Sequence, residues 1–329
     1  MRGSSGECRE HKWREPMRGY DYTAGKAFEA ELPAMEGNPR IAFICNPHDV
    51  HSLMDIYGWD EDTVDECVNL DETVRYTSYD RYDFISLIYA EDDKEDISQR
   101  EVNIFFSKDY LALVLPENAD PRLSKLANGL VAAFPSAAAR PDPLAYLYYW
   151  IFDSLAVDFS DMLEGLEDKI EALLAMIERK PGKEQSLEIG QLRKMAYTYK
   201  KLLRSLSYIG GQILVDENHL LDDSQERYFR NIHMRLIKLY DFADSLYGLS
   251  NELIHTYDSK FSAKMNETIN KLTVITLLFG ILTVIAGIYG MNFTYMPELD
   301  WRFGYPATLG LMAAVGIVIY IVLKKKKWL

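Results

Sequence analysis

The segment IAGIYGMNFTYMPELDW, residues 285–301, lies near the end of this 329-residue chain and is its most informative part. It begins as an uncharged apolar run and reaches Gly290-Met291-Asn292 before a proline and two acidic residues. A second apolar run then follows. A buried core helix has no need of an asparagine at its tip, whereas a polar turn between two apolar runs is typical of a membrane hairpin.

Two uncharged segments flank this turn. No Asp, Glu, Lys or Arg occurs within residues 272–297 or within residues 303–323. As a helix, residues 272–289 measure about 27 Å, close to the thickness of a bilayer core. Residues 305–323 form a second run of similar length. The sequence therefore predicts a two-pass membrane protein.

The flanking residues predict the orientation of these spans. Lysines precede the first span, and the lysine run 324–327 follows the second, whereas the connecting loop holds a single arginine. Under the positive-inside rule, both termini are cytoplasmic and the loop faces outward. Aromatic residues suited to the outer interface are Tyr289, Tyr295, Trp301 and Tyr305. We expect the chain to lie in the cytoplasmic (inner) membrane.

One face of the first span is polar or small. Alternating steps of three and four residues keep a set of positions on one side of a supercoiled helix. This stripe consists of Asn266, Ile269, Thr273, Thr276, Gly280, Thr283 and Gly287. Such a stripe has two interpretations: close packing of membrane helices, or the lining of a pore. The residues alone favour neither.

The first span continues a longer helix. Between residues 224 and 271 there is no proline, and apolar residues recur at steps of three and four. This pattern predicts one helix of about 100 Å that runs from the cytosol through the bilayer. A stripe of this length needs partner helices, which identical copies of the chain would supply.

The preceding residues predict a cytoplasmic α+β body. Short β-like runs separated by turns occupy residues 40–115, and helical patterns over 142–180 and 183–214 meet at Pro181-Gly182 as an antiparallel hairpin. A net charge of −14 argues against nucleic-acid binding. The chain holds no P-loop, GxSxG or GxGxxG motif, so we expect no enzyme and no cofactor.

These patterns divide the chain into seven parts. They are a weakly ordered tail (1–38), an α/β domain (39–141), a helical hairpin (142–223), a stalk helix continuing into the first span (224–290), an outward loop (291–304), the second span (305–323) and a basic cytoplasmic end (324–329).

The string AGIYGMNFTYMPEL, together with a final span ending in KKKKWL, resembles the CorA family of divalent-cation transporters. The order of elements also matches over nearly the whole chain. The resemblance implies a funnel-shaped homopentamer in which the first span of each copy lines one central pore. It therefore favours the pore-lining interpretation of the stripe.

The resemblance also implies roles for individual residues. Gly290, Met291 and Asn292 would form the outer selectivity ring that binds hydrated Mg²⁺, with Gly290 letting the backbone turn. Leu272 would line the pore together with the stripe residues and form a hydrophobic constriction in it. Asn266 would form an inner polar ring. The remaining implied residues are the loop acids Glu298 and Asp300, the basic collar Lys324, Lys325, Lys326 and Lys327, and Asp92 and Asp93 as half of a regulatory metal site.

The chain departs from the family pattern at two positions. Gly280 stands where many members place a bulky apolar residue in the inner pore. Counting back from Asn266, Asn231 stands where some members have a stalk aspartate that binds regulatory Mg²⁺. An amide lacks the charge that a divalent ion prefers, so feedback by Mg²⁺ is expected to be weaker or relocated.

The predicted function is a passive Mg²⁺ channel whose partners are further copies of itself, the lipid bilayer and divalent cations. Two alternatives remain open. One is the same fold carrying Co²⁺, Ni²⁺ or Zn²⁺. The other is a membrane-tethered sensor or adaptor that conducts nothing.

Overall fold

The computed structural model describes residues 16–32, 39–69, 74–93, 96–116, 121–291, 296 and 301–325. The chain forms two compact units. The first comprises Met1–Leu173 and Leu187–Glu252, and the second comprises Leu174–Ser186 and Leu253–Leu329.

The first unit is built on a mixed sheet. Within the described residues, seven strands form it in the order β2-β1-β3-β7-β6-β5-β4. The strands β3 and β7 pair in parallel, and every other neighbouring pair is antiparallel. This confirms the predicted mixed sheet. The strands are β1 (Arg18–Asp21), β2 (Lys26–Glu29), β3 (Ile41–Cys45), β4 (Arg75–Ser78), β5 (Asp83–Asp93), β6 (Asp96–Phe106) and β7 (Tyr110–Val114).

The sheet begins earlier than the sequence predicted. A weakly ordered tail was expected over residues 1–38, and this is wrong for residues 18–29, which form β1 and β2. These strands are four residues each and partly polar, so they carry little of the apolar alternation that marks a strand. Only glycine fits at Gly19, because an added Cβ would lie 2.6 Å from the Ala42 carbonyl oxygen of β3.

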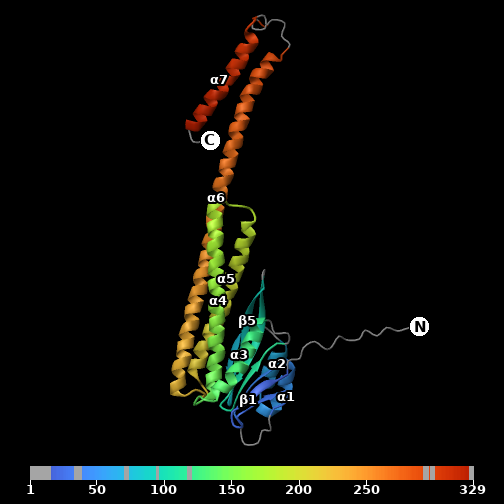
Figure 1. Ribbon diagram of the computed structural model, residues 1–329, viewed down its shortest axis with the longest axis vertical. Coiled ribbons are helices and arrows are strands. Elements are labelled where there is room, and N and C mark those ends of the chain that lie inside the picture. Colours follow the sequence, from blue (N-terminus) through green and yellow to red (C-terminus); the bar gives the residue numbers. More distant parts are fainter. Residues whose placement is uncertain are drawn as a thin grey trace, which may run out of the picture. The chain divides into compact units, whose positions relative to one another are not determined.

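Alternate side chains of β6 face two different layers of helices. Phe105 stacks on Trp59 at a ring distance of 3.9 Å, beneath helices α1 (Pro47–Tyr57) and α2 (Glu61–Asn69). The next residue, Phe106, stacks on Tyr148 of α4 (Pro143–Arg179) at 4.2 Å. Because successive side chains of a strand point to opposite faces, the sheet is covered on both sides. Figure 1 shows this layering, with α3 (Pro121–Ala137) beside α4.

The helices that follow the sheet are long. The hairpin arms are α4 and α5 (Gln185–Val215), separated by the Pro181-Gly182 break. The next helix, α6, runs without interruption over Asp223–Tyr289, which corresponds to about 100 Å. A final helix, α7, spans Gly304–Lys325. The predicted long helix is thus confirmed, and α6 and α7 are long and apolar enough to contain the two predicted spans.

Within the first unit, α5 and α6 pack in antiparallel directions. Lys200 of α5 forms a 2.5 Å ion pair with Asp244 of α6. Further along, an added Cβ at Gly210 of α5 would lie 3.1 Å from the His233 ring of α6. Later residues of α5 therefore meet earlier residues of α6.

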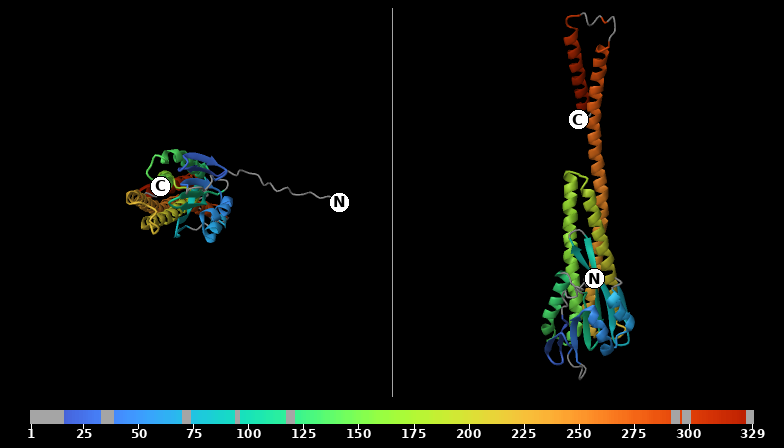
Figure 2. Two further views of the ribbon diagram at one scale, coloured as in Figure 1. Left: turned by 90° about the horizontal axis from the view of Figure 1, so that it is seen from below. Right: turned by 90° about the vertical axis from the view of Figure 1, so that its right-hand side faces the viewer.

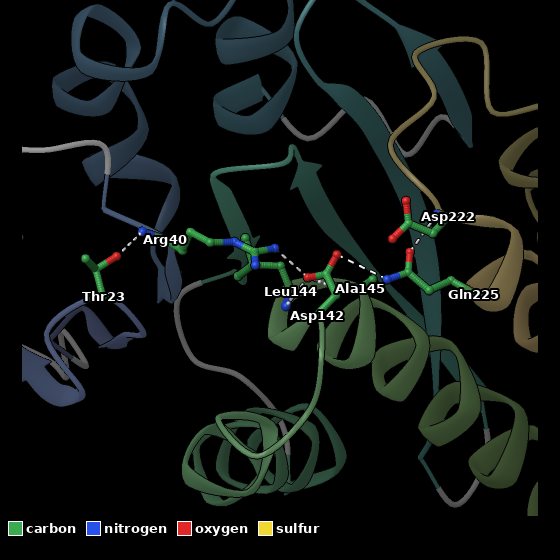
Figure 3. Close-up of polar contacts among 7 residues, drawn as sticks. All are labelled: Thr23, Arg40, Asp142, Leu144, Ala145, Asp222 and Gln225. Carbon is green, nitrogen blue, oxygen red and sulfur yellow. Dashed lines mark hydrogen bonds and ion pairs between the residues drawn. The ribbon is translucent and has the colours of Figure 1, made fainter.

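A polar joint ties the sheet and α4 to the start of α6 (Figure 3). Asp142 precedes α4 and accepts hydrogen bonds from the backbone N–H groups of Leu144 and Ala145 at 3.1 and 3.3 Å. The Asp142 Oδ1 atom also pairs with the Arg40 guanidinium at 2.5 Å, and Gln225 Nε2 donates to Asp142 Oδ2 at 3.1 Å. One carboxylate thus caps α4 and holds the first turn of α6.

A second joint lies in the loop between α5 and α6. Asn218 donates from Nδ2 to the Tyr79 carbonyl at 2.5 Å and to Asp83 Oδ1 at 2.9 Å. Asp83 is 3% exposed and also accepts from the hydroxyls of Tyr76 and Ser78. Burial raises the pKa of the Asp83 carboxyl above its ordinary value.

Candidate ion pathway in the membrane spans

Two helices are long and apolar enough to cross a membrane, namely α6 in its C-terminal part and α7. Almost no residue of either apolar segment is buried within the chain. A core helix of a soluble protein would bury this surface, so its exposure is what a lipid environment requires. In both views, α7 returns beside the end of α6 (Figures 1 and 2).

The span of α6 has two distinct sides. Its less exposed positions are Val274, Leu278, Leu282 and Ile285, with Val274 only 7% exposed. At about 3.6 residues per turn, these four share one face, which is the face suited to contact with α7. The stripe of small and polar residues lies on roughly the opposite side of the helix. Its exposed members in the span are Thr273, Thr276, Gly280, Thr283 and Gly287.

The threonine hydroxyls of this stripe are already bonded within the helix. Thr273, Thr276 and Thr283 each donate from Oγ1 to the carbonyl four residues earlier, at 2.8, 2.9 and 2.7 Å. Each hydroxyl proton is therefore used, and each oxygen retains lone pairs that accept hydrogen bonds. A stripe of this kind presents acceptors to water or to a hydrated cation without leaving a polar hydrogen unpaired.

The C-terminal end of α6 stops just before the predicted ring residues. The Gly290 N–H still donates to the Ala286 carbonyl at 3.0 Å, and the Met291 N–H donates to the Ile288 carbonyl at 3.3 Å. Met291 is half exposed. The predicted ring residue Asn292 and the loop acids Glu298 and Asp300 lie outside the described residues.

At the other end of the span, the stripe continues through exposed side chains. Asn266 is exposed, and Ile269 and Leu272 are 51% and 63% exposed. Lys271 pairs with Glu267 at 2.6 Å, one turn apart on α6. The predicted collar residues Lys324 and Lys325 close α7 and are exposed, whereas Lys326 and Lys327 lie outside the described residues.

Metal-binding candidates in the first unit gain no support from geometry. Among the described residues, no group of three or more His, Cys, Asp or Glu side chains could hold a metal ion. Asp92 and Asp93 belong to β5, but their side chains lie outside the described part of the chain.

One contact that precedes the apolar run of α6 was not predicted. Lys264 of α6 donates from Nζ to the Pro181 carbonyl, in the turn of the α4–α5 hairpin, at 2.7 Å. The Pro181-Gly182 break predicted the turn. The sequence around Lys264 does not indicate which distant carbonyl group its side chain contacts.

Comparisons with known proteins cover most of the chain. The sequence model of the family described as CorA-like Mg²⁺ transporter protein matches residues 44–325. The cobalt/magnesium transport protein CorA of Thermotoga maritima is 27% identical over 285 residues, covering 85% of this chain and 80% of that protein. The putative metal ion transporter YfjQ of Bacillus subtilis is 27% identical over 279 residues, covering 84% and 85%.

A solved structure supports the fold. The complete structure of the CorA magnesium transporter from Methanocaldococcus jannaschii matches with a TM-score of 0.78 at 18% identity, covering 97% of this chain and 100% of that one.

Proposed function

Because this chain belongs to the family of CorA-like Mg²⁺ transporter proteins, we propose that it is a passive Mg²⁺ channel whose pore is lined by the α6 stripe. The proposal rests on the side of α6 on which the stripe lies. Thr273, Thr276 and Thr283 lie on the side of α6 away from the face suited to α7, with their oxygens free to accept hydrogen bonds. Two spans alone enclose no water-filled path, so several copies must share the pore.

The chemistry of this lining suits a hydrated divalent ion. Mg²⁺ dehydrates reluctantly and prefers octahedral oxygen ligands. Neutral hydroxyl and carbonyl oxygens contact its water shell without removing the ion from that shell. A ring of Asn292 amides at the pore mouth would recognise the same shell, and Glu298 and Asp300 would raise the local cation concentration. The described part of the spans holds no His or Cys that would capture a softer metal ion.

The driving force needs no cofactor. A divalent cation gains about 5 kcal/mol per 100 mV of inside-negative potential, since each unit charge contributes about 2.3 kcal/mol. In this proposal both termini are cytoplasmic and the assembly is a homopentamer in the inner membrane. Exposed Ile269 and Leu272 form the constriction that closes the pore by excluding water.

Regulation by Mg²⁺ follows from the stalk. Asn231 is exposed on α6 and carries no charge. Feedback inhibition through this position is therefore weaker than an aspartate would give. Asn231→Asp should make flux more sensitive to Mg²⁺ on the cytoplasmic side.

A second candidate function changes the ion and keeps the pathway. The Thermotoga maritima relative is named a cobalt/magnesium transport protein. Co²⁺ is therefore the first competitor to test, ahead of Ni²⁺ and Zn²⁺.

The test is uptake into proteoliposomes containing the full-length protein under an inside-negative potential. Each divalent cation is supplied alone and then in competition with Mg²⁺. Uptake of Mg²⁺ that rises with the imposed potential supports the channel. A folded oligomer that takes up no divalent cation at any internal Mg²⁺ concentration would instead indicate a sensor or adaptor.

A further inference from the structure

The turn of the α4–α5 hairpin lies close to the membrane surface. The bond from Lys264 Nζ to the Pro181 carbonyl fixes this turn beside residue 264 of α6. The apolar run of α6 starts eight residues later, at Leu272, which is about 12 Å along the helix. Because a headgroup layer extends roughly 6 Å beyond the hydrocarbon core, side chains of the turn are within reach of headgroups.

The turn is held in one shape by a single side chain. The Gly182 N–H donates to Gln185 Oε1 at 2.9 Å, and Gln185 Nε2 donates to the Lys180 carbonyl at 3.3 Å. The amide of Gln185 thus binds the backbone on both sides of Pro181. Residues 179–184, here called the hairpin tip, are therefore presented in a fixed arrangement.

The hairpin tip carries three exposed basic side chains: Arg179, Lys180 and Lys183. Glu178 and Glu184 border it. The membrane-proximal segments 178–184, 258–271 and 324–327 together contain ten basic and four acidic residues, in a chain whose net charge is −14. Leu187, in the first turn of α5, is 72% exposed and adds an apolar side chain.

We infer that the hairpin tip is a binding site for anionic phospholipid headgroups of the cytoplasmic leaflet. Arg179, Lys180 and Lys183 contact the phosphate-bearing headgroups, and the Lys264–Pro181 bond holds the tip at the required depth. A lysine or arginine near an anionic membrane surface contributes about a fivefold preference. The inference rests on the crossing of the membrane by α6 that the proposed function requires.

A fluorophore on the tip tests this placement. Gly182→Cys is a suitable attachment site, because an added Cβ meets no atom within 4 Å. Cys45 and Cys67 are buried, which raises the pKa of both thiols and protects them from labelling. Cys8 is replaced by serine. The matched control site is Tyr208→Cys, an exposed position about 35 Å along α5 from its start.

The labelled full-length protein is reconstituted with lipids that carry a spin label on the headgroup, either phosphatidylglycerol or phosphatidylcholine. We expect quenching at position 182 and not at 208, with phosphatidylglycerol quenching severalfold more at equal mole fraction. The triple variant Arg179→Gln/Lys180→Gln/Lys183→Gln should lose this preference. A control triple variant makes the same change in net charge on other exposed residues and should keep the lipid preference: Lys201→Gln/Arg204→Gln/Lys238→Gln.

Three outcomes overturn the inference. They are absence of quenching at position 182, equal quenching by the two lipids, and loss of the preference in both triple variants. Mg²⁺ uptake measured in the same vesicles separates this inference from the proposed function. If Mg²⁺ is taken up but position 182 shows no preference for phosphatidylglycerol, only the headgroup site is rejected. If the preference is present but Mg²⁺ is not taken up, only the channel is rejected.

Discussion

Gln225 donates a hydrogen bond from Nε2 to Asp142 Oδ2 at 3.1 Å, so the first turn of α6 is fastened to the residue that caps α4. Asp142→Ala removes this bond together with the cap of α4, and we expect a loss of about 1–2 kcal/mol in stability. Thermal unfolding of the detergent-solubilised protein, followed by tryptophan fluorescence, measures it.

Asp142→Asn is the control, because asparagine caps a helix nearly as well as aspartate. The ion pair with Arg40 is partly exposed, at 36% and 23% side-chain exposure, and therefore contributes less than about 1 kcal/mol. The asparagine variant keeps the cap, but its Nδ2 group cannot accept the bond from Gln225 Nε2, so it should lose less stability than the alanine variant. Equal losses in both variants would show that the charge of Asp142 and its bond to Gln225, and not its capping bonds, stabilise the joint.

The second joint predicts a dependence of stability on pH. Burial raises the pKa of Asp83 in the folded state, so the folded chain binds this proton more tightly than the unfolded chain does. The contribution of Asp83 is fully present below its unfolded pKa, near about 4, and decreases as pH rises through the raised folded value.

Asp83→Asn removes this titration. As pH rises from the unfolded to the folded pKa of Asp83, the native protein should lose stability relative to the variant. Unfolding midpoints measured from acidic to neutral pH test this. A difference that does not vary with pH would mean that the hydrogen bonds from Tyr76, Ser78 and Asn218 fully offset the burial of the charge.

In the proposed pore, Gly280 leaves the inner part wide. An added Cβ at Gly280 meets no atom of this chain within 4 Å, and the same holds for Gly310 in α7. Gly280→Leu should lower Mg²⁺ flux severalfold, because a ring of leucines narrows the pore and excludes water. Gly310→Leu is the matched control and should leave flux unchanged. Equal flux in the two variants would place Gly280 away from the pathway.

The threonine hydroxyls offer a second test of the lining. Thr276 Oγ1 donates to the Leu272 carbonyl at 2.9 Å, and Thr308 Oγ1 of α7 makes the same bond to the Gly304 carbonyl at 2.9 Å. Thr276→Val should reduce Mg²⁺ flux, because it removes an acceptor from the pathway. Thr308→Val removes an equivalent bond outside it. If both variants lose flux alike, the bonds serve helix packing instead.

Much of the fold could be predicted because its signals are local. The uncharged runs over 272–289 and 305–323 predicted the two spans. The absence of proline between residues 224 and 271 predicted that α6 is one helix. The break at Pro181-Gly182 gave the hairpin. The strands β1 and β2 escaped prediction, because these four-residue strands are stabilised by pairing, β2 with β1 and β1 with β3, and not by their own alternation.

Contacts between distant residues could not be predicted. Asp142 begins the predicted helical pattern, but the neighbouring sequence does not indicate that Arg40 and Gln225 are its partners. The same holds for Asn218 with Asp83, and for Lys264 with Pro181. For the pathway, the sequence supplied the stripe. Only the structure shows that this stripe lies opposite the less exposed face of α6.

In the proposed function, hydrated Mg²⁺ crosses the membrane through a pore of α6 helices, with the Asn292 ring at its mouth. Mg²⁺ uptake into proteoliposomes under an inside-negative potential, with the native protein and Asn292→Ala reconstituted in equal amounts, tests this pathway. We expect rapid uptake by the native protein and almost none by the variant, with both forming the same oligomer. Equal uptake by the two proteins would rule out conduction through an Asn292 ring.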